Sequence, residues 1–321
     1  MGTPLQLCYP VTTLDGKELL PAGVFLTEET MNDLVHSARA EAFPAMKLME
    51  YESVAADLRS ICESPPYHRM FSDVARRDEV FQAMQRVELA RPLLEIYSYF
   101  KLHDPYTYLH ILSVFALSIL LARELVKDPA ERALELAAAT SHDFGKICVP
   151  PSILKKTTPL EEWERQRLSH HAAAGYVLLS YYLKDHRHPA AITARDHHER
   201  IDGSGYPRGI LLDSRFVEIV AVGDIFDALA SSRPYRQSSF DLRGALEEIT
   251  QQAGRGKIHA DVVRALISCN REGHPPYETC NFSSELRSRP PEDNHYCGAA
   301  PCHFDPQCAL EDEGEGGGGK A

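Results

Sequence analysis

The amino-acid sequence predicts a mainly helical protein, in which an all-helical domain follows a small α+β segment and precedes an irregular tail. Two observations predict this fold class. Between residues 94 and 270, apolar residues recur at helical spacing and alternating strand patterns are almost absent. After residue 271, proline pairs, cysteines and a glycine-rich end indicate irregular chain. We therefore expect a small N-terminal regulatory or docking domain (1–93), a helical domain (94–270) and a tail with a flexible end (271–321).

Composition and charge exclude several classes of protein. The chain has 321 residues, of which 44% are hydrophobic and 25% charged, which excludes a wholly disordered chain, a collagen-like fibre and a membrane channel. Its net charge is −12, so a surface that binds duplex nucleic acid is not expected. A small anionic ligand remains compatible with this charge, because a few basic side chains in one pocket suffice.

The sequence also predicts a cytoplasmic protein without a membrane span. The chain does not open with a basic stretch followed by an apolar one, so a secretory signal is not expected. The most apolar run, Ile111 to Ala122, is shorter than the ~18–20 residues of a membrane span and predicts a core helix. Four scattered cysteines are expected to be buried thiols of a reducing compartment, namely Cys8, Cys62, Cys148 and Cys269.

In the first segment, only a few elements can be predicted. Leu14 to Lys17 contains Asp-Gly and predicts a turn between two short extended stretches. Thr27 stands before two glutamates and predicts a helix start, with helix over Thr30 to Ala40. A small sensor, receiver-like or docking domain fits these signals.

The helical domain is predicted to hold seven principal helices. An apolar-rich helix runs from Leu109 to Val126, and Pro129 then begins a second helix over Ala130 to Thr140. The run Thr-Pro-Leu-Glu at 158–161 combines capping-box spacing with a proline at the first helical position and predicts a helix to about Lys184. Apolar periodicity predicts the remaining helices, which are Pro189 to Glu199, Val217 to Ser231, Asp241 to Gln252 and His259 to Ser268.

Histidine is unusually frequent, with 15 residues against a single tryptophan, and neutral imidazole is the commonest metal ligand. Five histidines and two aspartates stand on or at the ends of predicted helices, namely His110, His142, Asp143, His171, His197, His198 and Asp224. Taken singly, each is more often an ordinary core or surface residue. Together they exceed the needs of one metal, whereas two metals about 3.5–4 Å apart that share an aspartate would use the set and leave room for a bridging hydroxide. Mixed imidazole and carboxylate ligands favour iron or manganese over zinc.

Four stretches of sequence carry a family resemblance. Ser141 to Lys146 reads Ser-His-Asp-Phe-Gly-Lys, and His197 to Pro207 reads His-His-Glu-Arg-Ile-Asp-Gly-Ser-Gly-Tyr-Pro. Val222 to Leu229 and Arg233 to Arg236 follow in the same order. This order of motifs, over roughly residues 95–270, resembles the HD-GYP family within the HD superfamily of metal-dependent phosphohydrolases. Members of that family are bacterial phosphodiesterases that degrade the signalling molecule cyclic di-GMP.

The resemblance implies that residues 94–270 form a catalytic domain that hydrolyses cyclic di-GMP through a hydroxide activated by two metal ions, with the linear dinucleotide or GMP as product. It implies that the seven histidines and aspartates above are the ligands, with Asp143 bridging the metals and Lys146 stabilising charge on the scissile phosphate. It also implies contacts to the substrate from the lip of its groove and from two arginines, namely Gly205, Tyr206, Pro207, Arg233 and Arg236. Glu199 and Asp202 are expected to shape the loop between these motifs.

Two other functions stay open at this point. One is a sensor that binds a cyclic dinucleotide, or meets partner proteins through the Gly-Tyr-Pro loop, without turnover. The other is a hydrolase of another cyclic dinucleotide or of a nucleotide. A homodimer and a diguanylate cyclase partner are both compatible with the resemblance. Some family members carry a glutamate one helical turn before the first histidine, for a third metal, and this chain has Tyr106 there, which predicts a two-metal site.

The tail contains a second group of potential metal ligands. Its cysteines, with His295 and His303 nearby, are of the type that binds structural zinc, and they are Cys280, Cys297, Cys302 and Cys308. Their spacing contains no C-x₂-C pair. A structural zinc site and unliganded or redox-active thiols therefore stay open as alternatives.

Overall fold

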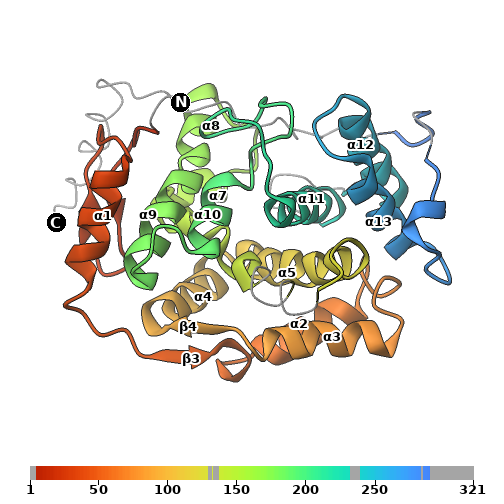
Figure 1. The fold of residues 1–321 in the computed structure, drawn as a ribbon, viewed down its shortest axis with the longest axis horizontal. Helices are drawn as coiled ribbons and strands as arrows, with labels where there is room; N and C mark the ends of the chain where they lie inside the picture. Colours follow the sequence, from red (N-terminus) through yellow and green to blue (C-terminus); the bar gives the residue numbers. More distant parts are fainter. Residues whose placement is uncertain (1–4, 129–131, 133–136, 232–238, 283–284, 290–321) are drawn as a thin grey trace, which may run out of the picture.

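The structure, a computed structural model, describes residues 5–128, 132, 137–231, 239–282 and 285–289. Helices make up most of this described chain, and Figure 1 shows how they are arranged. The described strands are short and form two antiparallel pairs. The prediction of a mainly helical protein is confirmed.

The described strands all lie in the first segment. β1 (Val11–Thr12) and β2 (Glu18–Leu20) pair across the turn that was predicted between them. α1 (Glu28–Ala38) begins where predicted, because the Thr27 hydroxyl accepts a hydrogen bond from the backbone N–H of Thr30.

The rest of the first segment packs closely on the helical domain. β3 (Ala45–Lys47) pairs with β4 (Glu88–Ala90), and α2 (Val54–Glu63) and α3 (Val74–Met84) lie between them in the chain. α1 packs on α9 (His171–Leu183), and α2 and α3 pack on α5 (Pro105–Leu125), as Figure 1 shows. As a result, one continuous set of buried apolar side chains extends from Leu7 to Cys280.

α5 (Pro105–Leu125) is the central helix and follows α4 (Arg91–His103) directly. It begins before the predicted Leu109, because Asp104 accepts a hydrogen bond from the Thr107 N–H and a proline occupies the first helical position. All residues from His110 to Ala122 are buried, since α4, α11 (Arg215–Ala230), α13 (Ala260–Asn270) and the first segment surround the helix. α5 is long and apolar enough to cross a membrane, yet 83% of its most apolar window is buried inside the protein, as in a core helix.

The long helix predicted from residue 158 to Lys184 is wrong, because the structure has two helices there. α8 (Glu162–Ser169) begins at a capping box formed by Glu161 and Glu164. α9 (His171–Leu183) follows after a break at His170. Neither Ser169 nor His170 is a helix breaker, so the sequence pattern continues across this change of direction. The short helix α7 (Pro151–Leu154) precedes the pair.

The other predicted helices agree with the structure to within a few residues. They are α10 (Pro189–Asp196), α11 (Arg215–Ala230), α12 (Leu242–Gly254) and α13 (Ala260–Asn270). Of the helix predicted over Ala130 to Thr140, the described part consists of Arg132 and the 3₁₀ helix η2 (Ala137–Ser141), and the remainder lies outside the described residues. A 3₁₀ helix, η3 (Phe144–Cys148), follows η2, and η4 (Tyr277–Thr279) follows α13.

The cysteines are only partly as predicted. The buried free thiols of the described chain are Cys62, Cys148, Cys269 and Cys280. Cys8 is disulfide-bonded, so the prediction of a free thiol at that position is wrong. The Sγ of Cys280 faces the carbonyl oxygen of Pro276 at 3.8 Å. The zinc site in the tail stays a prediction, because its other potential ligands lie outside the described residues, namely His295, Cys297, Cys302, His303 and Cys308.

Gly145 fixes how closely η3 packs on α9. A Cβ atom at this position would lie 1.9 Å from the carbonyl oxygen of His171 and 2.4 Å from the backbone nitrogen of Gly175. Both are backbone atoms and cannot rotate away. We therefore expect Gly145→Ala to lower the free energy of unfolding by about 3 kcal/mol or to prevent folding, as measured by urea unfolding followed by circular dichroism.

Gly254→Ala is the matched control for this substitution. A Cβ atom on Gly254, at the end of α12, meets no other atom within 4 Å. Helix propensity then favours alanine by up to about 1 kcal/mol, so this variant should be at least as stable as the unaltered protein. If Gly145→Ala unfolds at the same urea concentration as Gly254→Ala, the close packing described here is wrong.

Candidate metal centre

The seven predicted ligands lie close together in the structure, although they come from four helices and a turn. They come from α5 (His110), the turn after η2 (His142 and Asp143), the start of α9 (His171), the end of α10 (His197 and His198) and α11 (Asp224). His198 and Asp224 are partly exposed and the other five are buried, so the cluster reaches solvent on one side.

The donor atoms form two groups, each tight enough for one ion. The first donor triad is His110, His142 and Asp224. The second donor triad is His171, His197 and His198. Within each triad, the potential ligand atoms lie within 4.8 Å of one another.

Asp143 lies between the two triads and faces both. Its Oδ2 is 3.4 Å from the Nε2 of His110 and 3.6 Å from that of His142. Its Oδ1 is 3.4 Å from the Nε2 of His171 and 3.9 Å from that of His197. One carboxylate thus offers one oxygen to each triad, which is the arrangement of a bridging ligand.

Asp224 reaches toward both triads as well. Its Oδ1 is 3.1 Å from the Nε2 of His110, and its Oδ2 is 3.9 Å from the Nδ1 of His198. Asp224 therefore belongs to the first triad and also approaches the second.

Backbone carbonyls orient three of the imidazoles. The Nδ1 of His142, His171 and His197 lies 2.9, 2.6 and 3.0 Å, respectively, from the carbonyl oxygen three residues earlier. A carbonyl oxygen only accepts, so each Nδ1 carries the proton and each Nε2 keeps its lone pair toward the cluster. The Nε2 of His142 is buried and has no hydrogen-bond partner in the described part of the chain. A metal ion is the group that satisfies such an atom.

The protonation states of His171, His197 and Asp143 suit metal binding. Burial removes water from the imidazoles and lowers the pKa of His171 and of His197 to about 4. Burial also opposes ionisation of Asp143, but Lys146 and His142 outweigh it and hold the pKa of this carboxyl well below its usual range. These residues therefore present neutral imidazoles and an ionised carboxylate, the forms that bind metals.

His110 is held by Asp227, a residue to which the sequence analysis gave no role. The Nδ1 of His110 lies 2.6 Å from the Oδ2 of Asp227, and both side chains are buried. Burial lowers the pKa of His110, but Asp227, Asp143 and Asp224 outweigh it and raise this pKa well above its ordinary value. A carboxylate on the far nitrogen of a ligand histidine orients the ring and increases its basicity. The sequence offered one signal for this role, because Asp227 stands three residues after Asp224 and therefore lies on the same face of the helix.

Lys146 is directed at the bridging carboxylate. Its Nζ lies 2.5 Å from the Oδ2 of Asp143, within the turn formed by η3. The side chain is 16% exposed, so the ammonium group sits at the edge of the cluster rather than in bulk solvent. This position places a positive charge next to any anion that binds over the two triads.

The loop after α10 is shaped by carboxylates, as expected. Glu199 is fully buried and accepts hydrogen bonds from the backbone N–H of Arg208 (2.7 Å) and of Ile210 (3.2 Å). Asp202 accepts one from the backbone N–H of Ser204 at 2.9 Å. Both carboxylates are committed to the loop backbone rather than to the donor triads.

The Gly-Tyr-Pro part of this loop lies directly against the second triad. The ring of Tyr206 stacks on that of His198, with centroids 4.5 Å apart and planes 18° from parallel. A Cβ atom on Gly205 would lie 2.3 Å from the carbonyl oxygen of His198, so only glycine allows this approach. Arg233 and Arg236, the other predicted substrate contacts, lie outside the described residues.

The residues present fit two divalent ions. Tyr106, at the position where a third metal would need a carboxylate, stacks on the ring of His110 at 5.7 Å and 16°. Its phenol ring therefore packs against the first triad in place of that carboxylate. The donor set of five imidazoles and two carboxylates would therefore suit two ions, with Asp143 placed to reach both.

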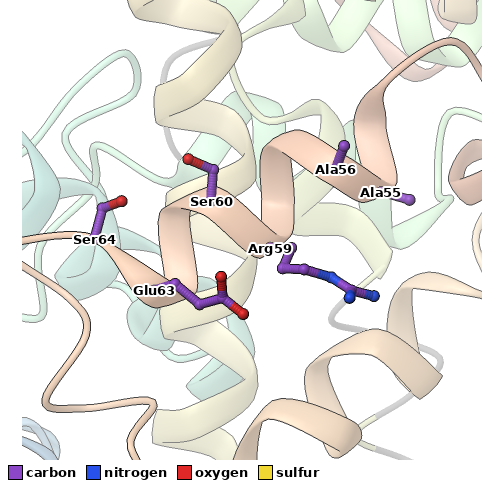
Figure 2. A pocket seen from close by; sticks show the side chains of 6 residues that line it. All are labelled: Ala55, Ala56, Arg59, Ser60, Glu63 and Ser64. Atoms are coloured by element: carbon purple, nitrogen blue, oxygen red, sulfur yellow. The ribbon is translucent and has the colours of Figure 1, made fainter.

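A surface groove lies apart from this cluster, along one side of α2 (Figure 2). Its lining residues are Ala55, Ala56, Arg59, Ser60, Glu63 and Ser64. These six side chains contain a single carboxylate and no imidazole or thiol, so the groove does not offer a metal donor set.

Comparison with known proteins matches the helical part of the chain to a family. The family profile described as HD domain matches residues 82–262, which is more than half of the sequence. A cyclic di-GMP phosphodiesterase response regulator of Xanthomonas campestris is 41% identical over 42% of this chain and 36% of its own length. A cyclic di-GMP phosphodiesterase of Pseudomonas aeruginosa is 37% identical over 52% of this chain and 40% of its own.

A third relative carries a different substrate in its name. The 3′3′-cGAMP-specific phosphodiesterase 3 of Vibrio cholerae is 41% identical over 41% of this chain and 29% of its own length. The chain thus spans less than half the length of each of these relatives. The resemblance to HD-GYP proteins drawn from the motifs agrees with these matches, and the chain belongs to the HD domain family.

Proposed function

We propose that this protein is a metal-dependent phosphodiesterase that hydrolyses cyclic di-GMP. The observation that supports it most is the position of Asp143, whose two oxygens face two separate donor triads at 3.4–3.9 Å. Two metals joined by one carboxylate are typical of enzymes that cleave phosphate esters. Iron or manganese suits the mixed imidazole and carboxylate donors.

The residues of the site have separate roles in the proposed reaction. Divalent ions held by the two triads and Asp143 would polarise the phosphodiester and lower the pKa of a water molecule. The backbone-oriented imidazoles keep their lone pairs fixed, so the donors need little rearrangement when an ion binds. Lys146, next to Asp143, supplies positive charge where negative charge grows on the phosphate oxygens. Tyr206, stacked on His198, forms a wall beside the second triad.

The choice of substrate rests on the relatives, which fall into two groups. Two of those described above are named for cyclic di-GMP, and one, at the same 41% identity as the first, is named for 3′3′-cGAMP. These substrates differ in one base. We assign cyclic di-GMP as the substrate and treat 3′3′-cGAMP as the competing candidate.

Turnover by metal-loaded protein tests the proposal. The protein is purified without oxygen, loaded with Mn(II) or Fe(II), and incubated separately with cyclic di-GMP and 3′3′-cGAMP, with products separated by chromatography. We expect linear dinucleotide from cyclic di-GMP, a higher kcat/KM for it than for 3′3′-cGAMP, and no product from His142→Ala. Binding of cyclic di-GMP without product would instead favour the non-hydrolytic sensor. A higher kcat/KM for 3′3′-cGAMP would reassign the substrate.

A further inference from the structure

Tyr67 belongs to the first segment of the chain, yet its hydroxyl reaches a carboxylate that supports the candidate metal centre. It lies in the turn between α2 and α3 and is only 4% exposed. The hydroxyl donates a hydrogen bond to the Oδ1 of Asp227, and the Oγ of Ser231 is 3.0 Å away. Asp227 is the carboxylate that holds His110, a member of the first donor triad.

The turn that carries Tyr67 is fixed in the core. The backbone N–H of Tyr67 donates to the carbonyl of Ser64 at 3.0 Å, and the N–H of Met70 donates to the carbonyl of Tyr67 at 2.8 Å. Met70 and Phe71 are fully buried. Burial and the neighbouring Asp227 raise the pKa of Tyr67 well above its ordinary value, so the phenol keeps its proton and acts as a donor. The hydroxyl is therefore presented to Asp227 by a rigid support.

Asp227 divides its two oxygens between Tyr67 and His110. Its Oδ2 faces the Nδ1 of His110 at 2.6 Å, while its Oδ1 accepts from Tyr67 and, at 3.2 Å, from the hydroxyl of Ser231. Because this carboxylate is buried, its oxygens depend on such donors in place of water. Its position in turn aims the Nε2 of His110 at Asp143 and Asp224.

We infer that Tyr67 is a positioning residue for the metal centre, through which the first segment holds the His110 end of the first triad by way of Asp227. The inference rests on the proposed two-metal site. Without the Tyr67 hydroxyl, Ser231 is the one side-chain donor that the described residues leave on the Oδ1 of Asp227, and both the carboxylate and the His110 ring gain freedom to move. A less ordered ligand binds its ion more weakly.

The affinity for Mn(II), measured by calorimetry on the metal-free chain of 321 residues, tests this inference. We expect Tyr67→Phe to weaken the ion bound at the first triad by about 3- to 10-fold, less than the roughly 10- to 100-fold typical when a residue that touches a ligand is changed. Asp227→Asn should show the larger loss. Because Tyr67 acts through Asp227, adding Tyr67→Phe to Asp227→Asn should weaken binding no further.

Tyr108→Phe is the matched control. Tyr108 is also buried and donates to a carboxylate, Asp57, at 2.6 Å, and it lies on α5 two positions before His110. Asp57 contacts none of the predicted ligands through its hydrogen bonds, which join it to Ser53, Lys101 and Tyr108. Tyr108→Phe should therefore bind Mn(II) as the unaltered protein does, even where its urea unfolding midpoint falls as much as that of Tyr67→Phe.

Three outcomes are decisive. Unchanged Mn(II) affinity in Tyr67→Phe, or equal losses in Tyr67→Phe and Tyr108→Phe, would overturn the role of Tyr67 and leave the proposed function intact. Additive losses in the double variant would show that Tyr67 does not act through Asp227. Failure of the unaltered protein to bind either Mn(II) or Fe(II) would refute the metal site itself, and with it both proposals.

Discussion

Asp143→Asn is expected to abolish turnover of cyclic di-GMP and to release at least one of the two metals. The change keeps the shape of the side chain but removes the negative charge that both triads face at 3.4–3.9 Å. Changing a residue that contacts a metal ligand without binding the metal itself costs roughly 10- to 100-fold in metal affinity or activity. Losing a ligand that two metals share should therefore cost at least about 100-fold in kcat/KM. Metal content by atomic emission and turnover by product release measure the two effects together.

Asp57→Asn provides the matched control for this loss. Asp57 also pairs with a lysine, since its Oδ2 lies 2.9 Å from the Nζ of Lys101, and it is also partly shielded from solvent. It is not one of the predicted ligands, so its loss should reduce stability without changing metal content. An Asp143→Asn protein that keeps two metals and turns over at the normal rate would rule out Asp143 as the bridge.

Lys146→Met should leave both metals bound and lower kcat by about 100-fold or more. Methionine keeps the apolar stem of lysine but has no charge to offset the growing negative charge on the phosphate oxygens. The effect should fall on kcat with metal content unchanged, because Lys146 is hydrogen-bonded to the proposed bridge Asp143 and is not a donor in either triad. Steady-state kinetics together with metal analysis separate these quantities.

Lys101→Met is the corresponding control, because it removes the lysine of a similar pair with Asp57 away from the triads. This variant should keep a kcat close to that of the unaltered protein. Should Lys146→Met turn over at the same rate as Lys101→Met, the proposed role of Lys146 in stabilising charge would have to be abandoned.

The site was easier to predict from the sequence than the path of the chain around it. Histidine and aspartate are recognised by their chemistry and by local motifs, so His142, Asp143 and His197 could be named without knowledge of the fold. The start of α1 could also be predicted from the sequence, because the Thr27 hydroxyl caps a backbone N–H only three residues away. Signals of this kind lie within one or two turns of helix.

Features that depend on distant contacts could not be predicted in the same way. No helix-breaking residue marks the break at His170 in the sequence, although the structure ends α8 and begins α9 there. Tyr67 meets Asp227 across 160 positions of sequence, and no local pattern connects the two residues. Asp227 itself stands three residues after Asp224 and could have been named from helical spacing, but its partner could not.

The break at His170 also affects how freely this region can change in sequence. α8 buries only Glu164 and Ser169, whereas α9 buries every residue from His171 to Tyr182. Exposed positions usually tolerate replacement with little loss of stability, and fully buried ones do not. Amino-acid substitutions should therefore accumulate in α8 while α9 stays nearly invariant. The two helices are nevertheless consecutive, and their sequence shows one continuous helical pattern.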